Sequence, residues 1–98
     1  MIEQIFAKEL QSFLLDNPDA LLLDVRQQFE FEEISLKNAM LIPLGELHQR
    51  LPEIFEYKHK PVIVYCKVGV RSMTACKILE EDGFSNLYNL NEGIIAFY

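Results

Sequence analysis

Two short, almost wholly apolar runs constrain the fold of this chain more than any other feature. Residues 21–25 are interrupted only by Asp24, and residues 61–65 begin with proline and continue as Val-Ile-Val-Tyr. Runs of this length without polar alternation are typical of strands that are buried on both faces of a parallel sheet. The segments around them carry apolar residues at helical spacing. Strands that alternate with helices in this way predict an α/β fold with a parallel sheet.

The same patterns predict the remaining elements. Three further apolar runs are strand candidates, at residues 2–6, 39–42 and 87–90. Three segments have helical apolar spacing, at residues 8–15, 27–33 and 44–55. Pro52 predicts a kink or break in the third of these. A fourth helix is expected over residues 72–82, with Ser72 as its N-cap and Gly83 as its C-terminal stop, and residues 93–98 form a last helical turn.

The length and composition fit one small domain. The chain has 98 residues, of which 50% are hydrophobic and 24% are charged, a composition typical of globular proteins. We therefore assign residues 1–98 to a single domain. The apolar runs are far shorter than the roughly 20 residues of a membrane span, and no basic leader precedes a long apolar stretch. We expect a cytoplasmic protein with no membrane partner.

The charged residues and the residues that could bind a metal argue against two further classes, nucleic-acid-binding proteins and metalloproteins. The net charge of −6 argues against a nucleic-acid partner bound by bulk electrostatics. The two cysteines and two histidines have no paired ligand spacing, so we expect no metal site and no other cofactor. Basic residues are concentrated between residues 57 and 79, a segment that contains Cys66 and no acid. Chance clustering on a solvated face is the alternative explanation.

Residues 62–72 carry the candidate chemistry. A buried strand ends at Cys66, a short loop containing Gly69 follows, and a helix is expected to begin at Ser72. Ligands of open α/β sheets bind at the carboxyl ends of strands. A tight loop before a helix turns its backbone N–H groups toward an anion, and Arg71 adds a permanent positive charge. These features predict a reactive thiolate; the alternative is a buried apolar cysteine and a surface arginine.

This loop closely resembles the active-site loop of rhodanese domains, and it consists of Cys66, Lys67, Val68, Gly69, Val70, Arg71 and Ser72. Other segments match the family in order, at residues 22–31, 39–44, 83–84 and 90–94. Some positions depart from its usual pattern. Ser35 replaces a histidine, Asn38 and Glu92 replace glycines, and Phe97 replaces a tryptophan.

The resemblance implies a five-stranded parallel sheet with helices on both faces, and it implies sulfur transfer. Cys66 would take sulfane sulfur from a donor such as thiosulfate or a persulfide. It would hold this sulfur as a persulfide and pass it to a thiophilic acceptor such as cyanide, a small thiol or a protein thiol. Arg71 would act with Cys66 by closing the ring around the terminal sulfur, and the substrate-binding backbone amides would be those of Lys67, Val68, Gly69, Val70 and Ser72. Asp24 and Arg26 would position loops through polar contacts.

Two other functions remain as alternatives. Phosphatases and arsenate reductases also place a cysteine in an anion-binding loop that ends in arginine. The loop of the related phosphatases is one residue longer than the four residues between Cys66 and Arg71. A catalytically idle binding module of the same fold is the second alternative. The other cysteine, Cys76, lies on an apolar helix stripe and is expected to pack in the core.

Overall fold

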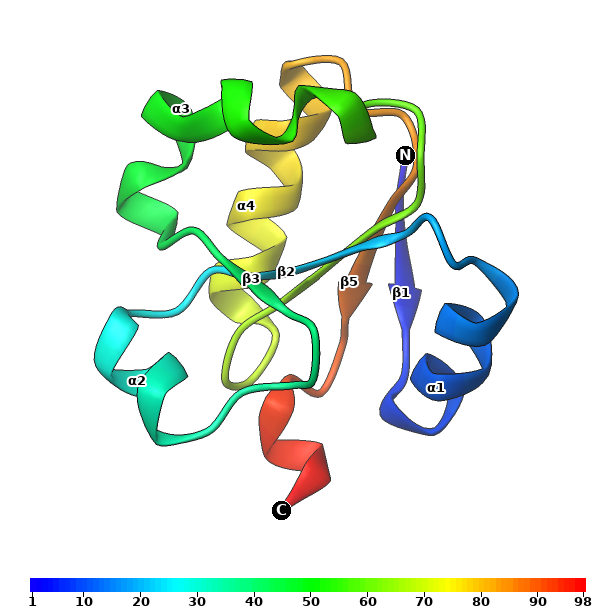
Figure 1. Cartoon of the computed structure of the whole chain (residues 1–98), viewed down its shortest axis with the longest axis vertical. Coiled ribbons are helices and arrows are strands. Elements are labelled where there is room, and N and C mark those ends of the chain that lie inside the picture. The colour runs from blue at the N-terminus through cyan, green and yellow to red at the C-terminus, as the bar shows by residue number, and fades with distance from the viewer.

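One parallel sheet organises the chain, as the computed structural model of residues 1–98 shows (Figure 1). Its strand order is β1-β5-β4-β2-β3, and every neighbouring pair is parallel. The strands are β1 (Ile2–Ile5), β2 (Leu21–Asp24), β3 (Met40–Leu41), β4 (Val62–Tyr65) and β5 (Leu87–Leu90). The predicted five-stranded parallel sheet is confirmed.

The two apolar runs form neighbouring strands near the centre of the sheet. Leu21 lies opposite Val62, and Asp24 lies opposite Tyr65. Every residue of both strands is buried. Because successive side chains point to opposite faces of a sheet, strands that are covered on both faces need apolar residues throughout.

Helices cover both faces, as predicted. The helical elements are α1 (Ala7–Asp16), α2 (Gln28–Glu33), η1 (Leu44–Glu46), α3 (Leu47–Arg50), η2 (Leu51–Tyr57), α4 (Val70–Glu81) and η3 (Ile94–Phe97). On one face, Leu23 and Val64 pack with residues of α3, η2 and α4. On the other face, Leu22 and Ile63 pack with residues of α1 and η3. None of the helices has the length and apolar character that crossing a bilayer requires.

The expected helix over residues 44–55 is divided into η1, α3 and η2. Pro52 lies in the first turn of η2, where a missing backbone N–H leaves no hydrogen bond unmade. The proline therefore begins a new segment instead of kinking a continuous helix. The strand expected over residues 39–42 is also shorter, because only Met40 and Leu41 pair with β2.

The helix expected over residues 72–82 begins two residues earlier, and Ser72 is not its N-cap. Gly69 occupies the N-cap position of α4 with a φ of 90°, a left-handed conformation that favours glycine. Ser72 lies inside the first turn, and its hydroxyl bonds to Asn89 on β5. A tertiary hydrogen bond thus replaces the local cap that the sequence predicts.

Candidate active site

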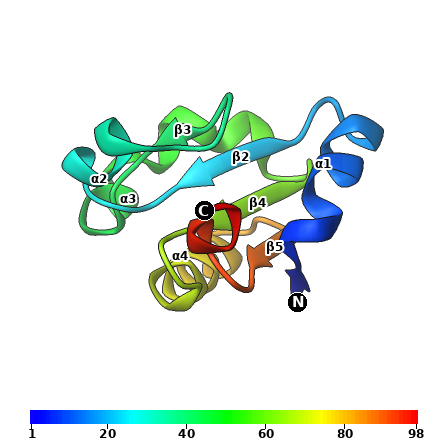
Figure 2. The same cartoon turned by 90° about the horizontal axis from the view of Figure 1, so that it is seen from below.

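Cys66 directly follows β4 and is fully buried at the carboxyl end of the sheet. The loop into α4, the helix α2 and the turn η3 gather at this end of the strands (Figure 1). Seen from below, η3 lies in front of the end of β4 (Figure 2). The strand order therefore brings three separate segments around one thiol, at the predicted location.

Backbone amides meet the sulfur of Cys66. The amide of Gly69 donates a hydrogen bond to Sγ at 3.1 Å, and the amide of Ser72 does so at 3.4 Å. Gly69 is the N-cap of α4 and Ser72 lies in its first turn, and the N-terminus of a helix carries partial positive charge. Of the five amides expected around the terminal sulfur, these two bond to Sγ. The side chains of Val68 and Val70 are exposed on the outside of the loop.

Hydrogen bonds lower the pKa of the Cys66 thiol. Burial is the largest influence and raises the pKa, because a buried thiolate loses its hydration. Hydrogen bonds to the sulfur from the backbone amides of Ser72, Val68 and Gly69 act in the opposite direction. The net result is a pKa below the ordinary value. Donors to the sulfur, and not a neighbouring cation, dominate this balance.

Arg71, which the resemblance assigns to the ring around the terminal sulfur, has a charged partner on another helix. Its guanidinium makes two hydrogen bonds with the carboxylate of Glu30 on α2, at 2.8 and 3.0 Å. Fork-shaped pairing of this kind is strong and geometrically specific. It lowers the pKa of Glu30 to about 2. Glu30 is thus a site residue whose role the sequence did not predict, although it lies in a segment that resembles the family.

The basic segment between residues 57 and 79 does not surround Cys66 with free positive charge. Arg71 is paired with Glu30, and Lys58 lies 3.7 Å from Asp82. Lys60 lies over the ring of Tyr57. Lys67 is the residue of this segment that lines the opening beside the loop. Any attraction for an anionic donor therefore depends mainly on one exposed lysine.

The segment after β5 packs against the Cys66 loop and bonds to its backbone. The amide of Ile94 donates to the carbonyl of Cys66 at 2.9 Å, and the amide of Ile95 donates to that of Lys67 at 3.2 Å. Gly93 has a φ of 73°, and a Cβ there would collide with the backbone of Lys67. Glycine at position 93 therefore allows the two backbones to approach closely.

A buried ion pair holds the segment after α2. Arg26 bonds to both carboxylate oxygens of Asp24, at 2.8 to 3.1 Å, and to the carbonyl of Ile34 at 2.6 Å. The hydroxyl of Tyr65 accepts a hydrogen bond from the amide of Leu36 at 3.1 Å. These contacts fix the end of α2, and so help to place Glu30 beside Arg71. This is the loop-positioning arrangement expected for Asp24 and Arg26.

A cavity of about 520 Å³ opens beside the loop. Its lining combines charged side chains with an apolar rim and consists of Arg26, Phe29, Glu30, Glu33, Ile34, Lys67, Ile94, Ile95 and Tyr98. Phe29 is 69% exposed and Tyr98 is 64% exposed. Large apolar side chains in water at the mouth of a cavity are typical of a surface that binds another molecule.

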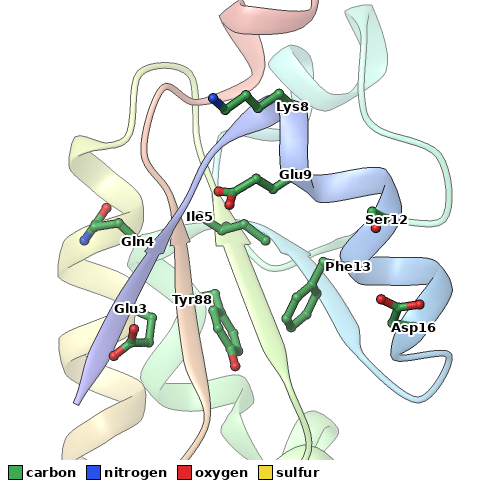
Figure 3. A pocket seen from close by; sticks show the side chains of 9 residues that line it. All are labelled: Glu3, Gln4, Ile5, Lys8, Glu9, Ser12, Phe13, Asp16 and Tyr88. Atoms are coloured by element: carbon green, nitrogen blue, oxygen red, sulfur yellow. The ribbon is translucent and has the colours of Figure 1, made fainter.

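A second hollow of about 510 Å³ lies between β1 and α1 (Figure 3). Glu3, Glu9 and Asp16 border it, and the rings of Phe13 and Tyr88 pack together with centroids 4.7 Å apart. None of its lining residues belongs to the Cys66 loop, whereas Lys67 of that loop lines the first hollow. The hollow beside the Cys66 loop is therefore the better candidate for the site.

Cys76 lies in the core between α4 and the sheet, as predicted. Burial raises the pKa of its thiol to about 12. Because the thiolate is the reactive form, Cys76 is inert near neutral pH. The two cysteines of the chain therefore differ sharply in chemical environment.

Comparisons with known proteins agree with this geometry. A curated tRNA uridine(34) hydroxylase from Escherichia fergusonii is 34% identical over 88 residues, which cover 86% of this chain and 25% of that protein. The enzyme of the same name from Escherichia coli (strain K12 / DH10B) is 32% identical and covers 97% of this chain and 28% of its own length. The chain thus spans about a quarter of these relatives.

Solved structures share the fold along nearly the whole chain. A rhodanese-like domain protein from Staphylococcus aureus has a TM-score of 0.87 and 28% identity, covering 98% of this chain and 91% of that one. An NAD-dependent persulfide reductase from A. fulgidus has a TM-score of 0.77 and 33% identity, covering 99% of this chain and 16% of that one. The profile of the family described as "Rhodanese-like domain" matches residues 6–98. As its loop sequence predicts, this chain belongs to the rhodanese-like domain family.

Proposed function

We propose that this chain is a sulfurtransferase that carries sulfane sulfur as a persulfide on Cys66. One observation carries the proposal: a buried cysteine at the end of a parallel strand, whose sulfur accepts hydrogen bonds from the amides of Gly69 and Ser72. Such donors stabilise negative charge on sulfur, both in the attacking thiolate and in a persulfide. Membership of the rhodanese-like family and the likeness to a persulfide reductase support the same chemistry.

The proposed reaction has two displacements at sulfur. The Cys66 thiolate attacks the sulfane sulfur of the donor, a new S–S bond forms, and the donor leaves as sulfite or as a thiolate. The acceptor then attacks the terminal sulfur of the persulfide, and Cys66 leaves as a thiolate. Each step forms one bond and breaks one bond, so no external oxidant or reductant is needed.

The surface beside the loop favours a protein thiol as one of the two partners. Thiosulfate is a small dianion, whereas the opening has an exposed apolar rim that includes Phe29, Ile95 and Tyr98. Apolar side chains of this size contribute to binding when a partner covers them. The charges at the opening are mixed in sign, so a small anion gains little there beyond its contact with Lys67.

The hydroxylation named for the curated relatives is not part of this proposal. That name describes proteins of which this chain matches about a quarter. The features on which the proposal rests, the loop and its thiol, lie within the matched quarter.

Intact mass spectrometry tests the proposed function. After incubation with thiosulfate or a persulfide donor, the protein should gain one sulfur atom, which cyanide or dithiothreitol should remove. The Cys66→Ser variant should gain none, and the Cys76→Ser variant should behave as the parent does. A folded parent that takes up no sulfur from either donor would support the idle binding module instead. Turnover of aryl phosphates that depends on Cys66 would support the phosphatase alternative.

A further inference from the structure

Buried polar groups lead from Cys66 to Asn89 on the neighbouring strand β5. The hydroxyl of Ser72 donates to Oδ1 of Asn89 at 2.5 Å, and neither residue is more than 1% exposed. Nδ2 of Asn89 donates to Oε1 of Gln4 at 3.0 Å and to the carbonyl of Gly69 at 3.4 Å. A carbonyl can only accept. The amide nitrogen of Asn89 must therefore face Gly69, which leaves its oxygen facing Ser72.

The network ends at the surface of the sheet. Gln4 lies on the edge strand β1 and is exposed. Figure 3 shows its side chain directed toward α4, away from Phe13 on α1. Gln4 also accepts a hydrogen bond from Asn91 at 3.2 Å. The orientation of Asn89 toward Ser72 is therefore fixed by Gln4, which does not touch the thiol, and by the carbonyl of Gly69.

Ser72 has one hydroxyl proton to donate. While that proton lies on Asn89, the oxygen of Ser72 presents lone pairs to Sγ of Cys66, 3.4 Å away, and accepts the thiol proton there. Once the thiol ionises, Sγ can only accept. The hydroxyl can then donate to sulfur only by leaving Asn89, and the buried amide oxygen would lose its partner at a free-energy cost. The thiolate and Asn89 therefore compete for one proton.

We infer that Asn89 is a positioning residue that holds the hydroxyl proton of Ser72 away from the Cys66 sulfur, and thereby limits how far the thiolate is stabilised. The purpose of this arrangement rests on the proposed function, in which Cys66 is the nucleophile. A thiolate with a strongly lowered pKa is a weaker nucleophile. Because Asn89 binds the hydroxyl proton of Ser72, the sulfur of Cys66 can still ionise, but its pKa is not lowered so far that the thiolate becomes a poor nucleophile.

Replacing Asn89 changes no charge around the thiol. The elements that pack around Cys66 carry many charged or titratable groups, namely Asp24, Arg26, Glu30, Glu32, Glu33, Tyr65, Lys67, Arg71, Cys76, Lys77, Glu80 and Glu81. On β5 itself, Tyr88 belongs to the other face of the sheet, where it packs on Phe13. All of these remain when Asn89 is substituted, so a shift in the titration of Cys66 reports a change in the hydrogen bonds to its sulfur, and the Ser72→Ala variants below identify the released hydroxyl.

The experiment is a titration of the alkylation rate of Cys66 against pH, with iodoacetamide as the probe and intact mass as the readout. Asn89→Leu and Asn89→Ala both remove the acceptor, the first with nearly the same side-chain volume. We expect the midpoint to fall by about one pH unit in each, the size of one hydrogen bond to a charged group. Asn91→Ala is the matched control: it removes a nearby asparagine that bonds to Gln4 but not to Ser72, and it should titrate as the parent does.

Ser72→Ala provides a second and independent arm. Because the hydroxyl proton lies on Asn89, its removal should not raise the midpoint of the parent. In the Asn89→Leu background the same substitution should raise the midpoint, since the released hydroxyl then donates to the thiolate. A folded Asn89 variant, verified by circular dichroism, with an unchanged or higher midpoint would overturn the inference. A higher midpoint in Ser72→Ala alone would overturn it as well, even if both Asn89 variants fail to fold. No sulfur donor is used, so the result is independent of whether the protein transfers sulfur.

Discussion

Arg71 and Glu30 lie 41 residues apart in the sequence and form a two-bonded ion pair that joins α4 to α2 beside the Cys66 loop. The pair places a cation near the sulfur and neutralises it at the same time. Arg71 therefore holds α2 in place, a role that the loop sequence did not predict, and much of the positive charge that it did predict is neutralised by Glu30. The first predictions concern this pair.

Glu30→Gln should lower the pKa of the Cys66 thiol. The substitution removes the partner of Arg71 and leaves its positive charge free to act on the nearby thiolate. Arg71→Ala should raise the pKa only slightly, because the charge it removes is already paired. Alkylation rates measured against pH test both. Glu33→Gln is the control, since it removes the same charge from the same opening without contacting Arg71; an equal fall in that variant would contradict the role of the pair.

The same pair should make stability depend on acid. The pKa of Glu30 falls from 4.5 to about 2 in the folded protein, chiefly through its hydrogen bonds with Arg71. A lowered carboxyl pKa contributes stability that is complete above the unfolded value and is lost as pH falls toward the folded value. Urea unfolding at pH 6 and at pH 3 should show a loss smaller by about 0.5–1 kcal/mol in Glu30→Gln, a figure that allows for solvent around Arg71. Equal losses in parent and variant would show that the pair contributes nothing.

The two cysteines should respond in opposite ways to substitution by serine. Cys66→Ser should abolish sulfur uptake and leave the fold intact, because it removes the nucleophile. Cys76→Ser should retain uptake and lose about 1–3 kcal/mol of stability, because it places a hydroxyl in an apolar core. Sulfur uptake measured by intact mass and unfolding measured in urea separate the two effects. Uptake in the Cys66→Ser protein would exclude the proposed mechanism.

Gly93→Ala should distort the Cys66 loop, against which Gly93 packs. A Cβ at this position would collide with the backbone of Lys67, and the φ of 73° is unfavourable for alanine. We expect a loss of about 1–3 kcal/mol in unfolding free energy and slower alkylation of Cys66. Gly45→Ala is the matched control, because no atom lies within 4 Å of a Cβ built there. Similar behaviour of the two variants would mean that the close approach at Gly93 has no consequence.

Donor size should separate the roles of Lys67 and the apolar rim. Lys67→Ala should slow sulfur uptake from thiosulfate by several-fold at low salt, and the difference should fade as salt rises, because exposed charges are screened. Phe29→Ser should slow exchange with a persulfidated protein and leave uptake from thiosulfate unchanged. Rates for both donors in both variants test this pattern. If Phe29→Ser affects the two donors alike, the rim does not distinguish them.

Local patterns sufficed to predict the main elements of the fold. The two apolar runs predict β2 and β4 because each strand is covered on both faces, and the break after Cys66 predicts a loop at the carboxyl end of the sheet. The number of strands in the sheet was predicted from the resemblance to the family and not from the local patterns. The loop composition also led to the correct family, although the role of each residue remains a prediction.

Long-range partners account for what the sequence did not predict. Ser72 was expected to cap α4, but its hydroxyl bonds to Asn89, 17 residues away. Arg71 was expected to close the ring around the terminal sulfur, and its pairing with Glu30 on another helix was not predicted. In both cases the sequence correctly indicated that the side chain makes polar contacts, but it did not identify the partner. The partner depends on how separate helices and strands pack together. Patterns in a single sequence do not show which residues far apart in the chain lie close together in space.

The strand order also has a consequence for how this protein is made. β1 precedes the other strands of this sheet in the sequence but pairs only with β5, so it stays unpaired until β5 has been synthesised. The backing of the Cys66 loop by Gly93, Ile94 and Ile95 is likewise supplied only at that stage. Contacts so distant in sequence form slowly. A nascent chain that has already exposed Cys66 therefore lacks the finished site, and its thiol acquires its mature environment only after β5 and η3 have been synthesised.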